Sequence, residues 1–234
     1  MRRSNLGFML VMASILTVGA ARGAMSCMPP SMEALLAGYA KQHLEEDYYP
    51  AATSSGPVMA EADGKNVQWY GIQWESPPGG LLYVLSCDGK VLALKRIGAV
   101  LSIDAGPRLP GVGDTVIVDY IEGSGTGAQS QSASVLSLQG THLRELWTHD
   151  LNSYQFMLPG EHWKTNYTIG FSNKGQLVEA VGIKEIYHPD TAYDAKPDDV
   201  KHVRDIACWN AKQLRYLDCT ISEHELKSLR WNPP

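Results

Sequence analysis

The sequence predicts a mainly β protein of the α+β class: an antiparallel β-rich domain of about ten short strands, with an N-terminal amphipathic helix and a short C-terminal helix. Two observations carry this prediction. From residue 67 onward, short runs rich in Val, Ile, Leu, Tyr and Trp alternate with turn residues. Several of these turns are short glycine-containing connections typical of β-hairpins, such as Asp88-Gly89 and Gln139-Gly140-Thr141.

The first 23 residues predict an export signal. Arg2 and Arg3 precede an apolar run over residues 6–20, which is shorter than the stretch of about 20 apolar residues that spans a bilayer. The next three residues, Ala-Arg-Gly, match the small-x-small pattern of signal peptidase sites. We therefore expect residues 1–23 to be a signal peptide and residues 24–234 to form a single exported β-rich domain.

The arginine-rich start is typical of a bacterial leader, so the expected location is the periplasm or the medium. The alternatives are an uncleaved N-terminal anchor and a lipoprotein acylated on Cys27. The lipoprotein is less favoured because Ala24-Met25-Ser26 lacks the usual leucine. No later stretch is apolar and long enough for a membrane-spanning helix, so no transmembrane segment is expected after cleavage.

Without its leader the chain is acidic. Loss of three arginines leaves 17 of the 20 basic residues against 25 acidic ones, which moves the net charge from −5 to −8. A surface of that sign repels phosphate backbones, so nucleic acid is not an expected partner. The expected partner is an unknown protein or a glycan ligand.

Four cysteines predict two disulfides. An even number of cysteines in an exported chain favours disulfides over metal or catalytic thiols. Cys208 and Cys219 flank a polar stretch that can turn, so we expect them to pair across a hairpin. The favoured remaining pair is Cys27 with Cys87, although four cysteines allow three pairings.

The predicted elements follow from spacing and turn chemistry. Apolar residues recur at helical spacing over residues 32–44, after the N-cap Ser31. A sheet is predicted over residues 67–187, and a hairpin and helix over residues 206–230, where Ser222 and Glu225 form a capping box. The predicted strands cover residues 67–74, 81–87, 90–97, 100–104, 115–121, 133–138, 142–148, 165–171, 176–187, 206–210 and 214–219.

Two turns invite closer interpretation. Asp88-Gly89 between apolar runs predicts a type I′ hairpin turn. Gly123, Gly125 and Gly127 are not followed by the lysine or the helix of a phosphate-binding loop, and their spacing is not that of a dinucleotide fingerprint. They predict a wide, flexible hairpin loop between Ile121 and Ala133.

Residues 113–150, which contain this loop and a closing Leu-x-x-Leu-Trp strand, resemble one blade-type sheet unit of the β-propeller or FG-GAP kind. The resemblance implies a local sheet. A propeller needs at least four such units, and this one appears once, so no family is assigned.

Three clustered aromatic residues are candidate ligand contacts. Trp69, Tyr70 and Trp74 lie in a predicted strand and could form a stacking platform for a sugar. Aromatic residues are also enriched in strands because they pack well, and a role in the core or at an interface is the preferred interpretation.

Acid–base chemistry on a glycan needs two carboxylates across a cleft. Four acidic residues near the predicted strands could supply them: Asp104, Asp114, Asp119 and Glu122. His142, His149 and Asp150 could in principle bind zinc. However, the two histidines would face opposite sides of a continuous strand, so surface histidines are preferred and no metal site is predicted.

Motifs of the common hydrolases are missing from the sequence. It contains neither G-x-S-x-G, nor S-x-x-K, nor H-E-x-x-H. No catalytic residue and no cofactor is therefore assigned. The leading hypothesis is an exported non-catalytic protein acting by binding or envelope association. The alternative is a secreted hydrolase that uses paired carboxylates, with glycans as one substrate class.

Overall fold

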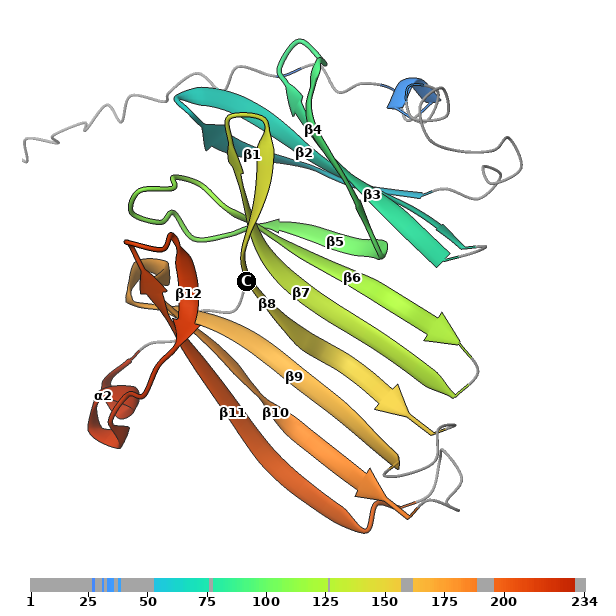
Figure 1. The fold of residues 1–234 in the computed structure, drawn as a ribbon, viewed down its shortest axis with the longest axis vertical. Coiled ribbons are helices and arrows are strands. Elements are labelled where there is room, and N and C mark those ends of the chain that lie inside the picture. Colours follow the sequence, from blue (N-terminus) through green and yellow to red (C-terminus); the bar gives the residue numbers. More distant parts are fainter. Residues whose placement is uncertain are drawn as a thin grey trace, which may run out of the picture.

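The protein forms two antiparallel β-sheets with few helices (Figure 1). The computed structural model describes residues 27, 31, 33–35, 38, 53–75, 78–125, 127–156, 162–188 and 196–229. The predicted signal peptide and most of the predicted helix 32–44 lie outside these residues. Of that helix region, Ser31 Oγ accepts a hydrogen bond from the backbone N of Ala34 at 3.1 Å, as an N-cap does. The helix over residues 32–44 stays a prediction.

Within each sheet, every strand pairs with its neighbours in sequence, and the chain passes from one sheet to the other between β4 and β5. The smaller sheet has the order β1-β2-β3-β4 and the larger one the order β12-β11-β10-β9-β8-β7-β6-β5, so both are meanders. The strands of the smaller sheet are β1 (Thr53–Ala62), β2 (Lys65–Glu75), β3 (Pro78–Ser86) and β4 (Val91–Ile97). Those of the larger sheet are β5 (Ala99–Ala105), β6 (Val116–Gly125), β7 (Ala128–Gln139), β8 (His142–Gln155), β9 (His162–Ser172), β10 (Leu177–Tyr187), β11 (Asp199–Asn210) and β12 (Arg215–Asp218).

The turn at Asp88-Gly89 joins β3 to β4 as predicted, but it is not of type I′. A type I′ turn requires positive φ at both central residues. Here Gly89 has φ +83°, and Asp88 is not among the residues with positive φ. The backbone N of Gly89 donates to the carbonyl of Ser86, which closes a type I turn followed by a left-handed glycine.

A type I′ connection occurs instead at Asp63-Gly64. Both residues have positive φ, +49° and +73°, and Ala62 pairs with Lys65 across them. This turn joins β2 to β1, a strand that the sequence analysis did not predict.

The glycine-rich stretch is a hairpin, as predicted, but not a wide loop. β6 continues to Gly125 and β7 begins at Ala128, and these two residues pair directly. A register shift between Ile121 and Gly123 absorbs the irregularity. Glycines lack the side chains that would favour a strand, and pairing with β7 overrides that preference.

The hydrophobic core has three parts. The first lies between the sheets and includes Trp69, Leu82, Val118 and Leu136. The second is built within the larger sheet, where residues of β6–β8 such as Val135 meet residues of β9–β12. The third lies on β2 and β3 and contains Ile72, Leu81 and the described Leu35.

Both predicted disulfides are present. Cys27 pairs with Cys87 at a Cα–Cα distance of 4.5 Å, and Cys208 pairs with Cys219 at 5.7 Å. The C-terminal helix α2 (Glu223–Ser228) begins with the predicted capping box, in which Ser222 Oγ accepts from the backbone N of Glu225.

Incomplete pairing between β8 and β9 creates the two hollows described below. β8 pairs with β7 from His142 to Gln155, but it pairs with β9 only over Asn152–Gln155. The two strands therefore run together at one end and diverge toward the other, where β12 approaches β8 (Figure 1). Two bulges in β8 also interrupt the alternation of its side chains between the two faces of the sheet.

Candidate functional site

The divergence of β8 from β9 leaves two hollows that share Thr148 and His149. The first hollow, named here the ring pocket, has a volume of about 470 Å³. The second, named the strand slot, has a volume of about 640 Å³. Both fall within the usual size range of small-ligand sites, about 300–1,000 Å³.

The ring pocket combines aromatic rings with hydroxyl, carboxylate and ammonium groups from five consecutive strands of the larger sheet. The rings belong to Trp163 and Tyr167 of β9. The remaining lining residues are Glu122, Ser132, Thr148, His149, Asp150, Thr165 and Lys184. Lys184 Nζ lies 5.8 Å from the centroid of the Trp163 ring, within cation–π range.

The carboxylates of the ring pocket are held by neighbouring hydroxyl groups. Ser132 Oγ donates to Asp150 Oδ1 at 3.2 Å, and the Tyr120 hydroxyl donates to Glu122 Oε1 at 3.2 Å. Ser132 and Tyr120 are themselves buried, with exposed fractions of 2% and 6%. These buried donors fix the direction of the two carboxylates.

A hydrogen-bond network continues from Tyr120 to the pocket. Its hydroxyl lies 3.1 Å from Ser134 Oγ, and Ser134 Oγ donates to Thr148 Oγ1 at 3.0 Å. Burial raises the pKa of the Tyr120 phenol, opposed by its bonds to Ser134 and Thr148, and nearby carboxylates raise it further. The phenol is therefore a hydrogen-bond donor throughout the physiological pH range.

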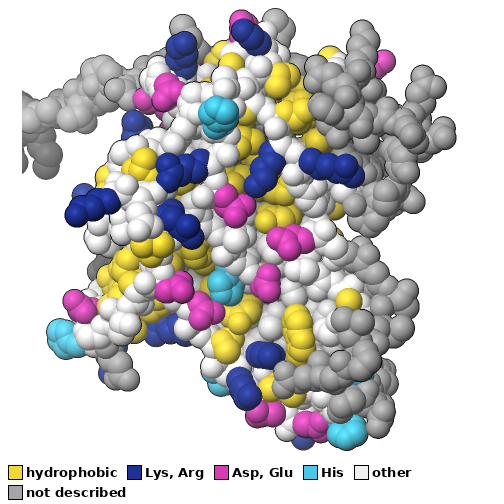
Figure 2. Space-filling model, viewed as in Figure 1, with side chains coloured by type: hydrophobic (Ala, Val, Ile, Leu, Met, Phe, Trp, Pro, Cys, Tyr) yellow, Lys and Arg dark blue, Asp and Glu magenta, His cyan; other side chains and the backbone are white. Residues whose placement is uncertain are grey.

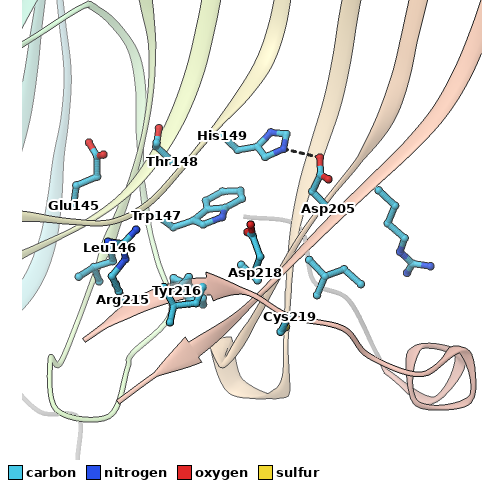
Figure 3. A pocket seen from close by; sticks show the side chains of 14 residues that line it. Glu145, Leu146, Trp147, Thr148, His149, Asp205, Arg215, Tyr216, Asp218 and Cys219 are labelled. Atoms are coloured by element: carbon cyan, nitrogen blue, oxygen red, sulfur yellow. Dashed lines mark hydrogen bonds and ion pairs between the residues drawn. The ribbon is translucent and has the colours of Figure 1, made fainter. Parts of the chain in front are cut away.

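His149 connects β8 to β11 across the divergence. Its Nδ1 lies 2.6 Å from the carbonyl O of Asp150, and its Nε2 lies 3.1 Å from Asp205 Oδ2 (Figure 3). The ring is stacked on Trp147 and is in edge contact with Tyr167, with centroids 5.5 and 4.6 Å away. The His149 side chain is 17% exposed, so it is partly buried within the lining of the two hollows.

Tyr167 lies beside two carboxylates. Burial raises the pKa of its phenol, and the negative charges of Asp205 and Asp150 raise it further. The hydroxyl accordingly stays protonated and available to donate a hydrogen bond. The ring pocket thus offers donors from tyrosine and lysine and acceptors from carboxylates around two aromatic faces.

The strand slot is lined by three runs of consecutive strand residues: 145–149 of β8, 204–207 of β11, and 215–219 on and just beyond β12. Figure 3 shows the β8 side chains on one side of it and those of β12 on the other. Acidic and basic side chains are interspersed on this side of the molecule rather than gathered by sign (Figure 2).

Two of the three aromatic residues that the sequence suggested as ligand contacts lie in the hydrophobic core. Trp69 is 1% exposed in the core between the sheets, and Tyr70 is 6% exposed in the core cluster on β2 and β3. They point to opposite sides of β2, as expected of successive strand residues. Trp74 belongs to β2, but its side chain lies outside the described part of the chain, so a binding role for it stays a prediction.

The carboxylates that the sequence suggested for acid–base chemistry do not lie in one site. Glu122 lines the ring pocket, whereas Asp114 accepts from the backbone N of Glu61 and pairs with Arg108. Asp119 accepts two hydrogen bonds from Gln131, at 2.9 and 3.0 Å. Burial raises the pKa of Asp119, the bonds from Gln131 lower it, and the charge of Asp104 raises it.

Most residues of the ring pocket were missed by sequence reasoning. Tyr167 and Lys184 lie 18 and 35 residues along the chain from His149, and no motif links them. The available signal was the spacing within β9, HWKTNYTIGFS, where Trp163, Thr165 and Tyr167 occupy alternate positions and therefore share one face of the strand.

No protein-family model matches the chain, and neither does any curated protein or solved structure. Within the described residues, no helix is long and apolar enough to cross a membrane.

Proposed function

We propose that this is an exported binding protein that holds a glycan in the ring pocket. The observation that carries the proposal is the composition of one 470 Å³ hollow, in which Trp163 and Tyr167 lie together with the carboxylates of Glu122 and Asp150. A sugar presents apolar C–H faces, which pack on aromatic rings, and hydroxyl groups, which donate to carboxylates.

The fixed geometry of the polar groups supports binding. Asp150 is oriented by Ser132 and Glu122 by Tyr120, so less side-chain entropy is lost when a ligand hydroxyl binds. Hydrogen bonds to charged acceptors contribute more than neutral ones, about 1.5–3 kcal/mol each.

Export is part of the proposal. Two disulfides agree with an exported chain, because disulfides persist in oxidising compartments. The proposed location is the periplasm or the medium of a bacterial host.

The test is binding to an immobilised glycan array, followed by calorimetry with the soluble form of the best glycan. The variants are Trp163→Ala and Asp150→Asn. The second should lose roughly ten- to a hundredfold in affinity, because one hydrogen bond to a charged acceptor is weakened.

Asp199→Asn is the matched control. Its carboxylate is 57% exposed and lies at the start of β11, away from the lining of the ring pocket. This variant should bind as the wild type does. Failure of every glycan to bind, or equal binding by the wild type and both pocket variants, would refute the proposal.

The second candidate function is glycan hydrolysis. It is favoured by the presence of two carboxylates, Glu122 and Asp150, in the same pocket as the two rings. The bound glycan would then be recovered cleaved, and either Glu122→Gln or Asp150→Asn would abolish cleavage. Recovery of the intact glycan after prolonged incubation would exclude this alternative.

A further inference from the structure

A third hollow shares no lining residue with the ring pocket or the strand slot. It lies between the loop that follows β5 and the 3₁₀ turn η1 (Asn173–Gly175), which joins β9 to β10. Residues 105–110, residues 174–176, Ile117 and Phe171 line it, and we name it the loop pocket. Its volume of about 720 Å³ is within the usual size range of small-ligand sites.

Part of the lining of the loop pocket belongs to the hydrophobic core. Leu109, Ile117 and Phe171 are 2%, 4% and 7% exposed, and all three are members of the core cluster within the larger sheet. Pro107 and Pro110 add further apolar groups to the lining. A surface of this kind gains free energy when an apolar part of a ligand covers it.

Close packing of two backbone segments brings the two cations of the lining into the same hollow. A Cβ atom at Gly175 would overlap the ring of Pro107, so only glycine allows this approach. Arg108 follows Pro107 in the sequence and Lys174 precedes Gly175. Both basic residues are therefore next in sequence to the contact.

The backbone on both sides of this contact is fixed by buried hydroxyl groups. The Tyr216 hydroxyl donates to the carbonyl of Gly175, and the Thr115 hydroxyl donates to the carbonyl of Pro107 at 2.7 Å. Lys174 has φ +56°, a left-handed conformation that costs free energy in a residue other than glycine and that occurs often at ligand sites. A lining held in this way loses less entropy when a ligand binds.

The charged residues of the loop pocket have one sign, although the chain as a whole is acidic. The chain has 25 acidic residues against 20 basic ones, whereas the described lining contains Arg108 and Lys174 and no acidic residue. Lys174 is exposed and forms no ion pair with any described residue.

Arg108 keeps hydrogen-bond donors for a ligand. Its guanidinium nitrogens lie 3.6 Å from Glu61 Oε1 and 3.4 Å from Asp114 Oδ1. Both distances are longer than an N–H···O hydrogen bond of about 2.7–3.2 Å. The guanidinium carries five N–H donors in a planar fork that matches the two oxygens of a carboxylate.

We propose that the loop pocket binds a small amphipathic carboxylate. The apolar tail packs on Leu109, Ile117 and Phe171, and the carboxylate pairs with Arg108 and Lys174. A neutral apolar molecule would leave both cations without a partner, and a small polar anion would leave the apolar lining uncovered. The proposal is independent of glycan binding in the ring pocket, because the two sites share no residue.

The experiment is calorimetry of the purified protein with decanoate below its micelle concentration. Three further probes divide the contributions of head and tail. Decanol has the same tail without the charge, acetate has the head without the tail, and decyltrimethylammonium carries the opposite charge. Each of these should bind at least tenfold more weakly than decanoate. No binding of decanoate, or equal affinity for decanoate and decanol, would overturn the proposal.

Two variants test the cations. Lys174→Asn removes one charge and keeps a residue that tolerates positive φ, and Arg108→Gln removes the other. Each should weaken decanoate by about tenfold, the expected effect of losing one charge-assisted contact. Lys90→Asn is the matched control, because Lys90 is also an exposed turn lysine but does not line the loop pocket. Equal weakening in Lys90→Asn would show attraction by any surface cation and would contradict the proposed site.

A measurement on the unmodified protein locates the tail. Nuclear Overhauser effects should connect the decanoate methylene protons to the methyl groups of Leu109 and Ile117. Their absence at saturating decanoate would overturn the placement of the tail in the loop pocket.

Discussion

The Cys208–Cys219 disulfide holds β12 in place, and removing it gives a quantitative test of the structure. β12 is four residues long and ends the larger sheet. It contributes Tyr216, whose ring packs edge-on against Trp209 with centroids 5.4 Å apart and whose hydroxyl donates to the carbonyl of Gly175. The perturbation is the double replacement Cys208→Ser with Cys219→Ser.

The expected cost follows from the length of the closed loop. The two cysteines are 11 residues apart, and chain entropy for a loop of that length predicts a loss of about 2.8 kcal/mol in the free energy of unfolding. Cys27 and Cys87 are 60 residues apart, so the same argument predicts about 4.3 kcal/mol for removal of that bond. The pair with the longer loop serves as the internal comparison.

Urea unfolding without reductant measures both costs, and native-state hydrogen exchange locates the effect. The amides of residues 215–218 should lose protection first in the Cys208/Cys219 variant, while those of the β3–β4 hairpin stay protected. An unfolding free energy within about 0.5 kcal/mol of the wild type would refute the entropic reasoning, since such a change is the size of an ordinary surface substitution. Early loss of protection in β3 would refute the local role.

Three further predictions concern single residues. Gly89→Val should lower the unfolding free energy by about 1–3 kcal/mol because Gly89 has φ +83°, whereas Gly89→Asn, which tolerates that region, should cost less; equal thermal midpoints for both would contradict the turn. Gly98→Ala should cost about 1–3 kcal/mol, since its Cβ would lie 1.8 Å from the Ile121 carbonyl O, and Gly123→Ala, with open space around it, is the control in the same denaturation assay. Asp119 has a raised pKa, so the folded state holds its proton more tightly than the unfolded state does. The stability of the wild type relative to Asp119→Asn should therefore fall as the pH rises from the unfolded pKa through the folded pKa of Asp119. A thermal midpoint of the wild type that rises relative to that of Asp119→Asn over the same pH range would contradict this.

The fold was largely predictable because its signals are local. Eleven of the strands correspond to runs that the sequence marks by apolar residues and turns. β1 was missed because its sequence, TSSGPVMAEA, contains proline, glycine and two serines, and only pairing with β2 makes it a strand. The extension of β6 through Gly123 and Gly125 was missed for the same reason, because pairing with β7 decides the conformation of these residues.

The candidate site could not be predicted in this way. His149 and Asp205 come together only because β8 leaves β9, and that divergence depends on bulges and on packing within the larger sheet. The expectation that His142 and His149 face opposite sides assumed a regular strand. One register shift in β8, at Leu146, lies between the two histidines and breaks that regularity. The Cys208–Cys219 pairing was within reach of sequence reasoning because hairpin spacing is a local property, and Cys27 with Cys87 then followed as the remaining pair.

The order of strands in the two meanders has a consequence for how the chain is assembled. Apart from the step from β4 to β5, where the second sheet begins, each strand docks on the strand just completed, so no strand waits for a partner that is synthesised much later. Assembly can advance from β1 toward β12 as the chain emerges, with every step closing a short loop at low entropic cost. β12 is then the last strand to dock, and the Cys208–Cys219 bond ties it to β11, the strand completed just before it.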